Sequence, residues 1–122
     1  MVNLTKKYVI GTHVMWFEIE MYADFIDGMV NLLETVENKD AVIVDLCFNM
    51  LQHFEKVDYD KIKKHELVIK FKKGVSKLES MGFIVNQEIK DGDEFYFHAD
   101  YRRDLNYNYC KKVDYVMWGE TD

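Results

Sequence analysis

Hydrophobic and polar residues follow two alternating patterns along the chain, and these predict an order of strands and helices. Short, nearly continuous apolar runs at 6–15, 41–49 and 114–118 are typical of buried strands in a parallel sheet. Over 22–36 the apolar residues instead recur every three or four positions, which predicts a helix with one buried face. A second helix of this kind is predicted over about 60–81.

The stretch after the second predicted helix carries weaker signals. Two strand-like runs flank the sequence DGD at 91–93, which predicts either a hairpin or a single strand, and residues 101–113 predict a short helix. The order is therefore strand, helix, strand, helix, hairpin or strand, helix, strand. We predict the α/β class, with three layers and a mostly parallel sheet flanked by helices. No linker or repeat divides the chain, so 1–122 is expected to form one domain.

The amino-acid composition indicates a globular protein and argues against nucleic-acid-binding and membrane-spanning proteins. An apolar fraction of 48% and a charged fraction of 31% are typical of a globular protein. The net charge of −6 argues against general binding to nucleic acid, which needs a concentrated positive face. No apolar run approaches the ~20 residues of a transmembrane helix, and no secretory signal is recognisable, so we expect a cytoplasmic chain. Cys47 and Cys110 lack zinc-site spacing, and Cys47 is expected to be a buried core residue.

Polar residues stand where the predicted strands end, and parallel α/β sheets bind ligands beyond the carboxyl ends of their strands. Thr12 lies in GTHV, Asn49 in FNM, and Glu120 and Asp122 in the terminal GETD. Two carboxylates two residues apart on an extended chain face the same side. They suit a hard divalent ion, Mg²⁺ or Mn²⁺, with positions left for diphosphate oxygens. A solvated acidic terminus without function is the alternative.

Several other side chains could have either a structural role or a role in ligand binding. His13 is better explained as a hydrogen-bonded structural residue than as a ligand contact, whereas His98 and Asp100 either line the same crevice or lie on the surface. Trp118 is expected in the core, and Phe17 is expected to cover the sheet together with the neighbouring tryptophan.

Residues 101–122, YRRDLNYNYCKKVDYVMWGETD, resemble the donor-site signature of family 2 glycosyltransferases of the GT-A fold. In that family an Arg and an Asn on a helix precede a hydrophobic strand that ends in an Asp-x-Asp motif. Here DYVMW stands in place of the strand and Glu120-Thr121-Asp122 in place of the motif. The sequence departs from the family in its first motif residue, a Glu, and in CFNM, which stands where Asp-Asp-Gly-Ser is usual.

The resemblance implies a Rossmann-like, nucleotide-binding half of the GT-A fold and a role in metal-assisted transfer of a sugar from a nucleotide-diphosphate donor to an acceptor hydroxyl. The implied roles are Mn²⁺ or Mg²⁺ binding by Glu120 and Asp122, phosphate binding by Arg102 or Arg103, and donor binding by Thr12, Asn49 and Asn106.

The acceptor site and catalytic base of the family follow the motif, so the chain is expected to be a donor-binding fragment of a longer enzyme that is inactive alone. The alternative is a small non-enzymatic α/β domain that acts by protein binding or self-association. A homodimer is compatible with both.

Overall fold

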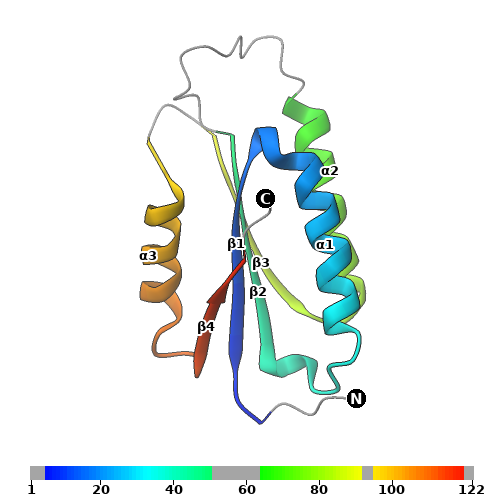
Figure 1. Ribbon diagram of the computed structural model, residues 1–122, viewed down its shortest axis with the longest axis vertical. Coiled ribbons are helices and arrows are strands. Elements are labelled where there is room, and N and C mark those ends of the chain that lie inside the picture. Colours follow the sequence, from blue (N-terminus) through cyan, green and yellow to red (C-terminus); the bar gives the residue numbers. More distant parts are fainter. Residues whose placement is uncertain (1–4, 51–63, 92–94, 120–122) are drawn as a thin grey trace.

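The computed structural model describes residues 5–50, 64–91 and 95–119. They form a four-stranded, all-parallel sheet in the order β3-β2-β1-β4, with helices on both faces (Figure 1). The predicted three-layer α/β class is confirmed, in a Rossmann-like arrangement. The strands are β1 (Tyr8–Met15), β2 (Val42–Asn49), β3 (Ile84–Lys90) and β4 (Tyr115–Trp118).

Two long helices cover one face of the sheet and one helix covers the other (Figure 1). Helices α1 (Ile19–Leu33) and α2 (Lys64–Ser80) lie side by side on the first face, and α3 (His98–Tyr109) lies on the second. The 3-10 turns η1 (Trp16–Glu18) and η2 (Lys39–Ala41) precede α1 and β2. Each helix joins two parallel strands, as parallel pairing requires.

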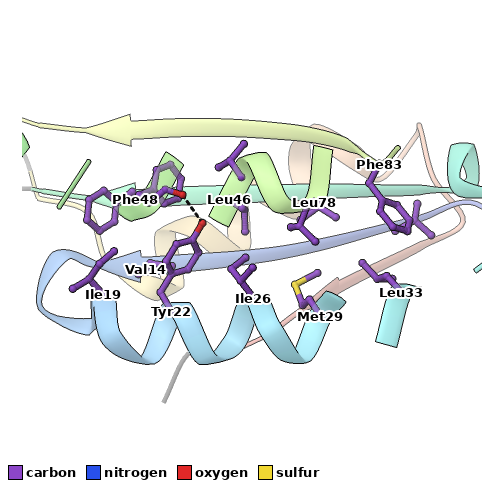
Figure 2. Close-up of a cluster of buried hydrophobic side chains, with 14 of the residues drawn as sticks. Val14, Ile19, Tyr22, Ile26, Met29, Leu33, Leu46, Phe48, Leu78 and Phe83 are labelled. Atoms are coloured by element: carbon purple, nitrogen blue, oxygen red, sulfur yellow. Dashed lines mark hydrogen bonds between the residues drawn. The ribbon is translucent and has the colours of Figure 1, made fainter. Parts of the chain in front are cut away.

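The larger core lies between the sheet and helices α1 and α2, where the predicted helical faces meet (Figure 2). The hydroxyl of Tyr22 on α1 donates a 2.8 Å hydrogen bond to the carbonyl of Phe71 on α2, and burial raises the pKa of Tyr22. The rings of Phe48 and Phe71 stack with centroids 5.0 Å apart. Burying each such side chain contributes about 1.5–3 kcal/mol. Other members of this core are Val14, Ile19, Ile26, Met29, Leu33, Leu46, Leu78 and Phe83.

A smaller core lies under α3 and depends on close packing at Gly11. A Cβ atom added there would lie 2.7 Å from a methyl carbon of Leu105, so only glycine lets α3 pack this tightly against β1. The first turn of α3 is closed by Asp100, whose carboxylate accepts a 2.8 Å bond from the Phe97 N–H. The buried residues of this core are Val9, Cys47, Tyr96, Tyr101, Leu105 and Tyr109.

Of the two interpretations of the stretch around DGD, a hairpin or a single strand, the structure has the single strand β3, because residues 95–97 are not a strand and instead lead into α3. That helix begins at His98 rather than at 101. Phe17, expected to cover the sheet, is 54% exposed, whereas the neighbouring Trp16 packs against the larger core. The expectation that Trp118 lies in the core is wrong, since this residue is 45% exposed. Trp118 is exposed because β4 is an edge strand, a position that an apolar run alone does not reveal. The predicted start of the second helix at about residue 60 lies outside the described residues.

Candidate functional site

The strand order places a topological switch point between β1 and β4. From β1 the chain moves outward to β2 and β3 on one side, and β4 lies on the other side of β1. In open parallel sheets the ligand crevice lies at the carboxyl ends of the two strands that flank this point. β4 pairs only with the first half of β1, since Trp118 lies opposite Gly11. The carboxyl-terminal half of β1, from Thr12 to Met15, therefore extends beyond the last residue of β4.

Thr12 fastens the end of β4 to β1. Its hydroxyl donates a 2.8 Å hydrogen bond to the carbonyl of Gly119, and the Gly119 N–H donates a 2.9 Å bond to the carbonyl of Gly11. Thr12 is 1% exposed and Gly119 is half-buried, so this bond is partly shielded from water. Gly119 thus continues the pairing of β4 with β1 by one residue and is held by a side chain as well as by the backbone.

Asn49 is fully buried at the end of β2 and binds across to β1. Its amide nitrogen donates a 3.0 Å bond to the carbonyl of Tyr96 and lies 3.0 Å from Nε2 of His13. Because an amide nitrogen only donates, Nε2 of His13 accepts, and the neutral ring then carries its hydrogen on Nδ1. The expectation of a hydrogen-bonded structural histidine at position 13 is confirmed, since His13 is only 3% exposed.

His98, the first residue of α3, continues this hydrogen-bonded chain toward solvent. Its Nδ1 lies 3.1 Å from Nδ1 of His13 and accepts the hydrogen carried there. Its Nε2 lies 4.0 Å from Oε1 of Glu18, a buried carboxylate that accepts a 3.0 Å bond from the Met15 N–H. The His98 side chain is 41% exposed. The chain therefore runs from buried Asn49 to a ring at the surface of the carboxyl edge.

A polar cavity of about 340 Å³ lies between α3 and strands β2 and β3. At its floor Asp45 accepts bonds of 2.7 Å and 2.9 Å from the hydroxyls of Tyr101 and Tyr109. Burial raises the pKa of Asp45, and these two bonds offset part of that effect. Tyr96 donates a 2.7 Å bond to Asp104. These bonds hold α3 on the sheet. The tyrosine hydroxyls and carboxylates that line the cavity are therefore hydrogen-bonded to one another.

Lys90 and Glu88 of β3 also line this cavity. The Lys90 ammonium lies 3.0 Å from the Glu88 carboxylate and 4.1 Å from the centroid of the Tyr96 ring. These contacts bring the positive charge of Lys90 against an anion and an aromatic face, both of which stabilise it. The cavity lining thus combines paired charges with tyrosines that already bond to protein groups.

The predicted phosphate-binding arginines occupy different surroundings on α3. The Arg102 guanidinium lies 5.4 Å from the centroid of the Trp118 ring, beside the end of β4. The Arg103 guanidinium lies 3.5 Å from Asp100 and 3.4 Å from Asp104 and is largely exposed. Asn106 is exposed one turn after Arg102, on the same side of the helix. Arg102 therefore contacts β4, one of the two strands that flank the switch point, whereas the described contacts of Arg103 are with residues of its own helix.

Thr12 and Asn49, the predicted nucleoside contacts, are both buried and bonded within the protein, and their role toward a ligand stays a prediction. The predicted metal ligands Glu120 and Asp122 lie outside the described residues. Within 5–50, 64–91 and 95–119, no group of three or more His, Cys, Asp and Glu side chains is placed to hold a metal ion.

Comparisons with protein-family models, with curated proteins and with solved structures found no match. Among the helices in the described part of the chain, none has the length and apolar character needed to cross a membrane. The arrangement of the strands and the contacts of the side chains therefore carry the functional argument.

Proposed function

We propose that this domain binds a nucleotide-diphosphate sugar at the carboxyl edge of its sheet, as the donor-binding part of a glycosyltransferase. The observation that carries the proposal is the switch point between β1 and β4, because parallel sheets of this type bind ligands there. The sequence Glu120-Thr121-Asp122 follows directly on Gly119, the residue that Thr12 holds against β1. The acidic motif and the switch point are thus adjacent in the chain.

The proposed diphosphate subsite combines a divalent ion with Arg102. Glu120 and Asp122 supply carboxylate oxygens, the ligands that Mg²⁺ and Mn²⁺ accept in proteins. When bound, the ion supplies positive charge that neutralises the departing diphosphate. Arg102 lies against Trp118, two residues before Glu120, and donates charge-assisted hydrogen bonds to phosphate oxygens. We assign this role to Arg102 because its guanidinium lies beside the Trp118 ring at the end of β4, whereas the guanidinium of Arg103 lies beside Asp100 and Asp104.

The buried polar residues position this site in the proposal. Thr12 fixes Gly119, the last residue before the acidic motif, and Asn49 fixes His13, which in turn orients His98. His98 presents its partly exposed ring at the carboxyl edge. In the proposal this ring hydrogen-bonds to the nucleoside or stacks on its base. Asn106 lies one turn from Arg102 on the outer side of the same helix and extends the polar surface there.

Calorimetric titration with UDP and GDP, each with and without Mn²⁺, tests the proposal. One of the two nucleotides is expected to bind, and Asp122→Ala is expected to abolish the effect of Mn²⁺. Arg102→Ala should weaken binding about tenfold or more, the equivalent of one charge-assisted hydrogen bond. Arg103→Ala is the matched control and should bind as the wild type does. Absence of binding by the wild type under every condition contradicts the proposal, and so do equal losses in the two arginine variants.

A further inference from the structure

An apolar patch spans helix α1 and the edge strand β4. Leu32 is 65% exposed, Tyr115 52%, Met117 49% and Met21 39%, and Phe25 is half-buried between them. Met21, Phe25, Gly28 and Leu32 recur at intervals of three and four, so they form one stripe along α1. A Cβ atom added at Gly28 would meet nothing within 4 Å, which shows that the stripe is open to solvent. We call these residues of α1 and β4 the β4-edge patch.

The stripe and the strand are adjacent. A Cβ atom added at Gly119 would lie 2.8 Å from the ring of Phe25, so the middle of the α1 stripe packs against the residue that follows β4. Met117 points to the same face of the sheet as Gly119, because side chains two apart on a strand share a face. The helix stripe and the α1 side of β4 are therefore adjacent at the open edge of the sheet.

Two acidic residues of α1 are turned away from the β4-edge patch, and a third, exposed Asp24, lies at its rim, three residues after Met21. Glu20 and Asp27 point away from the stripe toward α2, where they lie 3.0 Å and 3.1 Å from the ammonium groups of Lys70 and Lys77. The opposite edge strand, β3, carries exposed Glu88, a charge of the kind that protects a strand edge from pairing. β4, from Tyr115 to Trp118, has no charged residue. The two edges of the sheet thus differ in charge, and β4 is the edge without charged residues.

We propose that the β4-edge patch is a homodimer interface in which β4 pairs antiparallel with β4 of a second copy. A two-fold axis through Val116 places Tyr115 of each copy opposite Met117 of the other, on the α1 face. Aromatic rings and methionine sulfur make favourable contacts of this kind. Val116 meets its own symmetry mate on the α3 face. This register keeps all paired side chains on matching faces, a condition that a one-residue slip breaks.

The same two-fold axis accounts for the stripe on α1. Because the axis stands perpendicular to the sheet, both α1 helices lie on one face of the joined sheet, each with its stripe toward the other copy. Burial of Leu32 and Met21 then adds apolar area to the backbone hydrogen bonds of the paired strands. A second copy of the chain thus covers both parts of the patch at once, and the carboxyl edges of the two copies point in opposite directions.

Sedimentation velocity over a range of protein concentrations tests this interface. The wild type is expected to dimerise, whereas Leu32→Asp and Met117→Asp should each raise the dimer dissociation constant at least about tenfold, because each buries carboxylates in the contact. Ile69→Asp is the matched control, since Ile69 is 63% exposed on α2 and should leave dimerisation unchanged.

Circular dichroism identifies any variant that fails to fold, in which case Leu32→Asp decides, because that side chain is the more exposed of the two. A wild type that stays monomeric at all concentrations overturns the proposal. A variant Leu32→Asp that folds and dimerises as Ile69→Asp does overturns it as well.

Discussion

The hydroxyl of Thr12 donates a 2.8 Å hydrogen bond to the carbonyl of Gly119, although the two residues are 107 positions apart in the chain. This bond joins the middle of β1 to the residue that follows β4, at the switch point of the sheet. Gly119, the residue before Glu120, is therefore held in place on β1. A site that uses Glu120 and Asp122 depends on that anchor, and the first prediction follows from it.

Thr12→Val removes the hydroxyl and keeps the shape of the side chain. We expect the free energy of unfolding to fall by about 1–2 kcal/mol, because a partly buried hydrogen bond is lost. Denaturant unfolding measures the change. Thr35→Val is the control: its hydroxyl makes an exposed 3.3 Å bond to the Leu32 carbonyl, so a change within about 0.5 kcal/mol is expected. Equal effects of the two substitutions would contradict a structural role for Thr12.

Two helix glycines should respond to alanine in opposite directions. At Gly74 of α2 an added Cβ would lie 2.8 Å from Cζ of Tyr22, so the ring must move and its bond to Phe71 is strained. Gly74→Ala is therefore expected to destabilise the fold by about 1–3 kcal/mol. At Gly28 of α1 the added methyl meets open space, and Gly28→Ala should stabilise by about 0.5–1 kcal/mol through helix propensity. Thermal unfolding of the two variants measures both signs, and a Gly74→Ala variant as stable as the wild type or more stable would refute the packing described around Tyr22.

The buried carboxyl group of Asp45 should make the stability of the fold depend on pH. Burial raises its pKa above the ordinary value of about 3.9, so the folded state disfavours the ionised form. The stability that Asp45 contributes is thus complete below the ordinary pKa and is lost as pH rises through the folded-state pKa. Relative to the wild type, Asp45→Asn should gain stability over this acidic range, because asparagine does not ionise. Urea unfolding of both proteins at a series of pH values measures this difference, and a difference that is constant with pH would rule out the raised pKa.

The two cysteines should differ in reactivity. Burial raises the pKa of the Cys47 thiol to about 12, whereas Cys110 is exposed. Because the thiolate is the reactive form, a disulfide reagent such as DTNB should modify one thiol rapidly in the native protein and the second only after denaturation. Cys110→Ser should lose the rapid phase. Rapid modification of Cys110→Ser in the native state would show that β2 is more open than described.

The sequence predicts those features of the fold that depend on local periodicity. The spacing of Tyr22, Ile26, Met29 and Leu33 identifies the buried face of α1, and the apolar run at 41–49 identifies the central strand. The DGD signal for a hairpin fails because it is local. The chain after β3 instead crosses to the other face of the sheet, where the Tyr96 carbonyl accepts a bond from Asn49 and α3 begins.

The candidate site is only partly visible in the sequence. Thr12 and Asn49 are found because the sequence places polar residues near the ends of predicted strands, where ligands bind in parallel sheets. Asn49 ends β2, whereas Thr12 lies in the middle of β1. The partners of these residues, Gly119 and His13, come from elements far away in the chain. Asp45 is missed for the same reason: it lies inside an apolar run, and the tyrosines that bond to it come from α3. Periodicity carries no information about such long-range polar contacts.

Mapping the ligand on the sheet tests the central claim most directly. Backbone amide chemical shifts are measured by NMR as UDP, or in a parallel experiment GDP, is added in the presence of Mg²⁺. We expect the largest changes at the carboxyl edge, in Thr12–Met15, Asn49, His98 and Gly119, with little change at the amino ends of β1 and β2. Changes centred on helices α1 and α2, or no changes with either nucleotide, would contradict a donor site at the switch point between β1 and β4.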